Sequence, residues 1–193
     1  MESRPRVWND FLGDLKSLEK NKRYYSAIEG STDIECFNYW VNELKENGFL
    51  HNHTRMWFAS IWIFTLELPW QLGAEFFLKY LSDADSASNT LSWRWVAGIQ
   101  TKGKHYLAKN WNIEKFTNGN FSPAILNENA VPISDSRNYA FSKINYSGLE
   151  TGSDSVVMFE NELNTDFLDN NNYKHAYFCL LSNDERQVKV SQE

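Results

Sequence analysis

The feature that most constrains this chain is a long apolar segment between two short polar clusters. The apolar segment runs from Met56 to Leu81, after the polar stretch 51–55 (HNHTR) and before the polar stretch 83–89 (DADSASN). A helix that is apolar on nearly all sides is a buried helix. We therefore expect this segment to form the core of a helical domain, with the two polar clusters facing each other across it.

The two polar clusters carry charges that need each other. Asp83 and Asp85 lie two residues apart, and burying a carboxylate without a partner is costly. Arg55 is the cation of the facing cluster, so the sequence predicts an Arg55–Asp83 ion pair. On a helix that starts at this cluster, Asn52, Arg55 and Met56 share one face, because residues three and four apart are neighbours. That face is where we expect the chemistry.

Hydrophobic spacing predicts a mainly helical fold with a small irregular or α/β extension at the C-terminal end. Thr32 and Glu35 have the spacing of a capping box, and Gly48 is placed to end the helix that follows. Two apolar runs late in the chain predict short strands, which as a lone pair would be only marginally stable. The expected elements are helices over 6–25, 33–47, 51–66, 72–81 and 110–116, another helix starting at Asn89, and strands over 155–159 and 176–181.

Three motifs in this region occur together: HNHTRM at 51–56, DAD at 83–85 with Asn89 after it, and WRW at 93–95. Together they resemble the flavin-binding half of the DNA photolyase and cryptochrome family. The resemblance covers about residues 33–121 and implies a helical bundle that binds FAD. The chain departs from the family pattern at His53, where Arg is usual.

The resemblance also implies which residues surround the FAD ring. In the family, the matching Arg and first Asp pair beside the flavin, the second Asp lies against the polar pyrimidine edge of the ring, and the Asn lies next to flavin N5. The cofactor-binding residues implied in this chain are Asn52, Arg55, Asp83, Asp85, Asn89 and Trp93.

The activity implied by the resemblance is repair of pyrimidine dimers in DNA by blue-light-driven electron transfer, which would make the protein a carbon–carbon lyase. Asn52 and Met56 would line the lesion pocket, Asn89 would tune the flavin, and Trp93 and Trp70 would reduce it in the light. The resemblance gives no position for a third Trp of the electron relay. The remaining candidates, for which packing is the simpler role, are Trp57, Trp62, Trp95, Trp111 and Tyr80.

The net charge of −6 argues against nucleic acid when the whole chain is counted, but its distribution changes that conclusion. Residues 1–126 hold 14 basic and 14 acidic side chains, and residues 127–193 hold 5 and 11. Within the neutral part, a basic patch with interleaved aromatics suits phosphates and unstacked bases. A solvated basic face is the plainer alternative. The DNA-binding residues expected from this patch are Arg94, Lys102 and Lys104.

Several other classes of protein are disfavoured. Cys36 and Cys179 lie far apart without metal-ligand neighbours, so we expect no disulfide, no metal site and a reducing, cytoplasmic setting. The most apolar stretch, 56–66, is too short to span a membrane. Asp83 and Asp85 could form an acid–base pair or a metal site in an unrelated enzyme, but Arg55 would compete for both.

The expected organisation is a partial FAD-binding helical domain over residues 1–121 and an acidic extension with short strands over 122–193. The segments by which the family binds the FAD phosphates, and its α/β antenna domain, have no counterpart. We therefore expect either a second chain that supplies the phosphate-binding half or a remnant that binds flavin poorly. Two alternatives stay open. One is a cryptochrome-like blue-light sensor without repair, and the other is a non-catalytic helical interaction protein.

Overall fold

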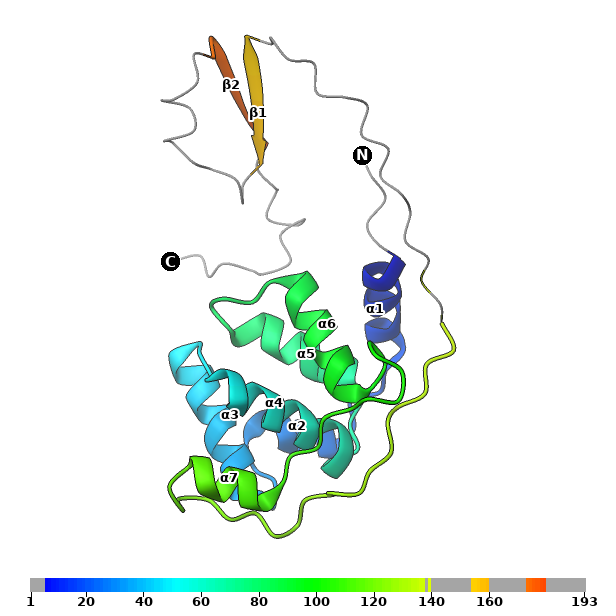
Figure 1. Ribbon diagram of the computed structural model, residues 1–193, viewed down its shortest axis with the longest axis vertical. Coiled ribbons are helices and arrows are strands. Elements are labelled where there is room, and N and C mark those ends of the chain that lie inside the picture. Colours follow the sequence, from blue (N-terminus) through cyan, green and yellow to red (C-terminus); the bar gives the residue numbers. More distant parts are fainter. Residues whose placement is uncertain (1–5, 138, 140–153, 160–172, 180–193) are drawn as a thin grey trace. The chain divides into compact units, whose positions relative to one another are not determined.

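The computed structural model describes residues 6–137, 139, 154–159 and 173–179. The chain forms two compact units, residues 1–139 and residues 140–193. The described part of the first unit is helical and that of the second holds two strands (Figure 1), which confirms the expected fold class. The helices are α1 (Arg6–Ser17), α2 (Lys22–Glu29), α3 (Glu35–Asn47), α4 (Asn52–Ser60), the π-helix η1 (Ile61–Thr65), α5 (Trp70–Tyr80), α6 (Ser86–Ala97) and α7 (Asn110–Phe116).

The first predicted helix, over residues 6–25, is in fact two helices. Asn21 begins α2 as its N-cap, because its side-chain oxygen accepts a hydrogen bond from the Tyr24 backbone N–H at 3.1 Å. An Asn side chain that accepts a hydrogen bond from the backbone favours the start of a helix. A new helix therefore begins here, although the hydrophobic spacing favoured one continuous helix. Gly30 then ends α2 in the left-handed conformation, at φ 70°.

Helix α3 starts without the predicted capping box. Its N-cap is Ile34, which makes no side-chain cap. The Thr32 hydroxyl instead donates to Asn38 Oδ1 at 2.7 Å, and the Asn38 amide donates back to the Thr32 carbonyl. The helix ends as expected at Gly48, which has a φ of 65°. Its backbone N–H donates to the Leu44 carbonyl, which completes a left-handed cap.

The buried central helix is confirmed, but its last part is a π-helix. α4 continues directly into η1, where the Leu66 N–H donates to Ile61 O at 2.8 Å, five residues back. A π-helix leaves carbonyls poorly paired at its end. The side-chain amide of Asn127 donates to Phe64 O there, and the Asn127 backbone N–H donates to the Thr65 hydroxyl.

Helices α5 and α6 pack closely against each other. Gly73 of α5 allows this approach, because a Cβ at that position would overlap the Trp93 ring of α6. Helix α6 begins at Ser86, three residues before the predicted start at Asn89, because the Asp85 carboxylate caps it by accepting from the Ser88 N–H at 2.7 Å. The predicted helix over 110–116 is confirmed as α7.

Residues 127–139, which we call the return segment, run from beside α7 to beside α1 (Figure 1) and belong to the first compact unit. Near its start, Glu128 accepts a hydrogen bond from the Asn110 N–H. In its middle, the Ile133 N–H donates to Ala97 O. At its end, Arg137 pairs with Asp14 at 2.9 Å.

The second unit contains β1 (Ser155–Phe159) and β2 (His175–Cys179), which pair in parallel. β1 is confirmed as predicted, and β2 begins one residue before its predicted start; the expected residues 180–181 lie outside the described part of the chain. Val157 and Tyr177 are exposed partners across the pair. None of the helices in the described ranges is long and apolar enough to cross a membrane.

Candidate functional site

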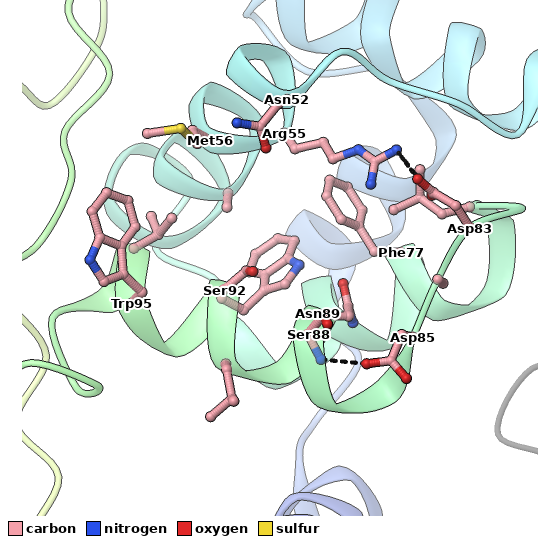
Figure 2. A pocket seen from close by; sticks show the side chains of 16 residues that line it. Asn52, Arg55, Met56, Phe77, Asp83, Asp85, Ser88, Asn89, Ser92 and Trp95 are labelled. Carbon is pink, nitrogen blue, oxygen red and sulfur yellow. Dashed lines mark hydrogen bonds and ion pairs between the residues drawn. The ribbon is translucent and has the colours of Figure 1, made fainter. Parts of the chain in front are cut away.

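A pocket of about 520 Å³ lies between α4 and α6, and it also reaches α5 and the α5–α6 loop. We call it the site pocket. Figure 2 shows Asn52, Arg55 and Met56 on the α4 side, with Asn89 and Ser92 on the α6 side opposite. Its volume falls in the range of small-molecule sites, about 300–1,000 Å³. The two polar clusters of the sequence therefore do face each other across this pocket.

Helical periodicity explains why these side chains converge. The α4 side chains that line the pocket come from positions 52, 55, 56 and 59, which form one face of a helix. The α6 side chains that line the pocket come from positions 88, 89, 91, 92, 93, 95 and 96, which cover a wider arc of that helix. Helix α4 thus presents one face to the pocket and α6 a wider arc, and both helices also contact the core.

Arg55 and Asp83 form the predicted ion pair. The Arg55 Nη2 atom lies 3.0 Å from both carboxylate oxygens of Asp83, and Arg55 Nε donates to the Leu50 carbonyl at 2.8 Å. The guanidinium is therefore held from two sides at the pocket wall, and Figure 2 shows its contact with Asp83. A charged hydrogen bond of this kind fixes geometry more firmly than a neutral one.

Asp85, the N-cap of α6, and Asn89 within α6 are also fixed. Asp85 lines the pocket while its carboxylate caps α6, as described above. The Asn89 side-chain amide donates to the Ala74 carbonyl of α5 at 2.9 Å. Because the amide nitrogen is held by α5, the carbonyl end of the Asn89 side chain has a defined orientation.

Trp93 forms part of the pocket wall and sits in the core. Its ring contacts Phe58, Trp62 and Phe77, with ring centroids 5.1 to 6.4 Å apart. Within the described ranges, its buried indole Nε1 has no hydrogen-bond partner. A buried donor left unpaired is unusual in a folded protein and marks a place where a ligand or water fits.

Trp70 and Arg94 lie outside the site pocket. Arg94 is 5% exposed and pairs with Asp135 of the return segment at 3.4 Å. Its guanidinium also covers the rings of Trp70 and Tyr139, at 5.8 and 5.4 Å from their centroids. Arg94 is thus unavailable at the surface, contrary to the expectation that it contacts DNA. Its partner could not be found by spacing along the chain, because 41 residues separate them.

Lys102 and Lys104, the other two expected DNA contacts, are exposed on the loop after α6. Part of the pocket wall comes from residues that the sequence motifs do not include. Ser88 and Ser92 lie three and seven residues after Asp85, so the helical spacing of α6 was the signal that would have found them. No comparable signal points to Phe77, which comes from α5.

Burial and charge act in opposite directions on Asp135. Burial raises its pKa, but the Arg137 backbone N–H and the guanidinium groups of Arg137 and Arg94 lower it, and the net result is a pKa below the ordinary value for Asp. Arg137 bridges Asp135 and Asp14, at 3.1 and 2.9 Å. This charge cluster holds the end of the return segment against α1.

A family model described as the FAD binding domain of DNA photolyase matches residues 10–121 of the chain. The chain belongs to this family. The photolyase FAD-binding family thus accounts for the whole helical region that builds the site pocket, and the resemblance inferred from the motifs is confirmed.

Similar proteins include photolyases and cryptochromes. The chain is 34% identical over 91 residues to a deoxyribodipyrimidine photo-lyase of Agrobacterium fabrum, covering 47% of this chain and 19% of the relative. It is 44% identical over 72 residues to one of Streptomyces griseus, covering 37% and 16%. It is 32% identical over 98 residues to cryptochrome-1 of Arabidopsis thaliana, covering 49% and 14%. The chain thus spans at most about a fifth of these relatives. No solved structure matches it significantly.

FAD is the cofactor of the photolyase FAD-binding family, and the site pocket fits its ring. Apolar side chains such as Phe77 and Val96 supply flat walls, while Arg55, Asp85 and Asn89 supply polar groups at one end. The unpaired Trp93 indole N–H provides a further donor. Arg55 is the one basic side chain among the lining residues, and Asp83 neutralises it. The described residues therefore fit the flavin ring of FAD rather than its diphosphate.

Proposed function

We propose that the site pocket holds the ring of FAD and that the protein takes part in blue-light-driven electron transfer for the repair of pyrimidine dimers in DNA. The observation that carries this proposal is the convergence of the Arg55–Asp83 pair, Asn89 and Trp93 on one pocket. Similarity to relatives named deoxyribodipyrimidine photo-lyase supports it.

When bound, FAD supplies the absorption of blue light and the capacity to transfer single electrons. The Arg55–Asp83 pair lies beside the ring, and its mutual pairing fixes both side chains in advance. Asp85 faces the polar pyrimidine edge of the ring. Asn89 presents its side-chain carbonyl to the ring from α6, with its orientation set by the hydrogen bond from its amide nitrogen to the Ala74 carbonyl. Trp93 contributes an electron-rich ring at the pocket wall, from which an electron can leave.

The mouth of the pocket suits an unpaired base of damaged DNA. Asn52 and Met56 approach it from α4, and Trp95 approaches it from α6 at the end where Met56 lies (Figure 2). Trp95 is among the exposed large side chains. An exposed indole stacks on an extruded base whatever its identity, and Lys102 and Lys104 carry charge that attracts the phosphate backbone.

A second polypeptide portion would supply what the pocket lacks. The diphosphate of FAD needs cations or backbone N–H groups, and the lining residues offer no free cation for it. We therefore propose that groups outside this sequence, for example on a partner chain, bind the FAD diphosphate.

The experiment is an absorption spectrum of the purified chain with FAD, before and after blue light. It is run with the chain alone and with the first half of the Agrobacterium fabrum photolyase FAD domain added as a separate polypeptide. Structured flavin bands that bleach in the light support the proposal. Bleaching should be lost in Trp93→Phe and kept in Trp57→Phe, a buried Trp elsewhere in the core. In Asn89→Ala, the absorption spectrum of the light-reduced flavin should differ from that in the wild type.

Turnover separates repair from its alternatives. Light-dependent loss of dimers from a thymine-dimer oligonucleotide supports repair. Bleaching without dimer loss supports a cryptochrome-like sensor. If neither the chain alone nor the mixture retains flavin, the proposal is overturned and a helical interaction protein is the better description.

A further inference from the structure

The side chains that line the site pocket carry a net charge of −1, from one cation, Arg55, and two anions, Asp83 and Asp85. Arg55 donates from Nη2 to both carboxylate oxygens of Asp83 and from Nε to the Leu50 carbonyl. Its positive charge is therefore already neutralised by a partner. No further cation among the lining residues balances the charge of Asp85.

The helix ends at the pocket offer no free place for an anion either. The N-terminus of a helix presents backbone N–H groups and the positive end of the helix dipole to a phosphate. At the start of α6, the Asp85 carboxylate already accepts from the Ser88 N–H at 2.7 Å. At the start of α4, the His53 N–H donates to His51 Nδ1 at 3.3 Å. A phosphate in the pocket thus meets an overall negative charge without compensating donors from these two caps.

Uncharged polar groups of the pocket, in contrast, remain open. Ser88 and Ser92 lie one turn apart on α6, and Asn52 lies on the α4 side opposite them (Figure 2). Within the part of the chain that the structure describes, none of these three side chains has a hydrogen-bond partner. Hydroxyl and amide groups bind the hydroxyls of a polyol, because both donate and accept. With apolar walls such as Phe77 and Val96, the lining suits a flat ring that carries a chain of hydroxyls.

We propose that the site pocket of this chain by itself selects an uncharged flavin, so that riboflavin binds more tightly than FMN or FAD. This inference rests on the proposed function, since it takes the flavin ring as the ligand of the site pocket. Riboflavin consists of that ring and a polyol chain, and it uses the apolar walls and the open polar groups. The phosphate of FMN and the diphosphate of FAD bring negative charge toward Asp83 and Asp85, which repel it.

The consequence concerns the loading of FAD. Because the charge of the pocket opposes the diphosphate, FAD is held firmly only when cations or N–H groups from outside this sequence bind that diphosphate. Occupancy by FAD is then coupled to assembly of the rest of the site. The chain by itself exchanges uncharged flavin and does not sequester FAD.

Equilibrium dialysis of the purified chain against riboflavin, FMN and FAD tests this selection, because flavin absorbance reports bound ligand whatever its phosphate content. At low ionic strength, riboflavin should bind about fivefold more tightly than FMN or FAD, or better, because like charges within one pocket repel. High salt should reduce this ratio to about twofold or less, because it screens the repulsion. The affinity for riboflavin itself should change by less than about twofold with salt.

Three variants identify the groups responsible, and a thermal melt shows that each is folded. Asp85→Asn removes the charge and keeps the cap of α6, because Asn is as good an N-cap as Asp; it should lower the riboflavin-to-FMN affinity ratio to about twofold. Glu114→Gln removes an exposed charge of α7 outside the lining and should leave the ratio unchanged. Ser92→Ala should weaken binding of riboflavin more than binding of lumiflavin, which has the ring without the polyol.

The inference is overturned if FMN or FAD binds the chain as tightly as riboflavin, or if neither salt nor Asp85→Asn changes the affinity ratio. It is also overturned if the chain by itself binds no flavin at all. The mixture with the added photolyase half-domain decides the proposed function separately. FAD retained by that mixture leaves the proposed function intact in each of these cases, and FAD lost from the mixture removes it even where riboflavin binds the lone chain.

Discussion

Arg55 and Asp83 are separated by 28 residues, yet one guanidinium nitrogen lies 3.0 Å from both carboxylate oxygens. This contact joins the start of α4 to the α5–α6 loop. Since Arg55 also binds the Leu50 carbonyl, the loop between α3 and α4 is tied to the same point. The wall of the site pocket is therefore fixed by one side chain before any ligand arrives.

Replacing Arg55 should weaken flavin binding much more than folding. The pair is partly exposed, with 24% of the Arg55 side chain and 58% of the Asp83 side chain accessible, so Arg55→Gln should cost at most about 1 kcal/mol of stability. Loss of a charged hydrogen-bond network should lower FAD affinity about tenfold or more. Fluorescence titration with FAD and a thermal melt measure the two effects. Arg23→Gln removes an exposed pair with Glu67 and should change neither; unaltered FAD affinity in Arg55→Gln would refute the role given to this pair.

Gly73→Ala should destabilise the first unit by about 1–3 kcal/mol, because the added methyl group collides with the Trp93 ring and a packed core resists extra volume. Gly13→Ala is the matched control in α1, where a Cβ meets nothing within 4 Å. That change should be neutral or stabilising by up to about 1 kcal/mol, since Ala favours helix over Gly. Urea unfolding of both variants measures the difference. Equal midpoints for the two would mean that Trp93 is not packed against Gly73.

Asp135→Asn should be strongly destabilising at neutral pH, by about 3 kcal/mol, because it leaves the buried Arg94 guanidinium without its counter-charge. The pKa of Asp135 is lowered in the folded state, so its contribution is present above the unfolded pKa of about 4 and is lost as pH falls through the folded value. The difference in free energy of unfolding between wild type and variant should thus be constant near neutral pH and should disappear at acid pH. Chemical unfolding from pH 3 to 8 follows it. Asp83→Asn, at an exposed pair, should change stability by less than about 1 kcal/mol.

A chain ending after Phe121 should be less stable than one ending after Tyr139, by about 3 kcal/mol or more. The shorter chain keeps α1 to α7 but loses the return segment, so Arg94 loses Asp135 and the π-helix loses the contacts of Asn127. Differential scanning calorimetry of the two chains tests this directly. Equal melting temperatures would mean that residues 122–139 do not stabilise the helical unit.

Much of the helical fold and the centre of the site could be predicted, because both follow from local spacing. Residues 52, 55 and 56 share a face of any helix, and an apolar segment beside two carboxylates needs the Arg55–Asp83 pair. The break between α1 and α2 was missed because one Asn side chain outweighed a periodic apolar pattern. The π-helix was missed because its hydrogen bonds leave no mark on hydrophobic spacing.

The role of the return segment could not be predicted from its sequence. Its polar composition is typical of an extension, and it attaches through single hydrogen bonds and ion pairs to residues far away in the chain, such as the Ile133 N–H to Ala97 O. Arg94 was predicted to lie at the surface for the same reason, because the sequence around it gives no sign that Asp135 pairs with it. Contacts of this kind depend on tertiary structure alone.

The return segment brings the two ends of the helical unit together. The Tyr139 hydroxyl donates to Asp10 at 2.9 Å, and Arg137 reaches Asp14 in the next turn of α1. A unit whose first and last elements touch can be carried as an insert in another polypeptide, or circularly permuted, without stretching its backbone. Because the two ends of the helical unit lie close together, the unit could be moved as a whole into another polypeptide while the pocket between α4 and α6 stays intact.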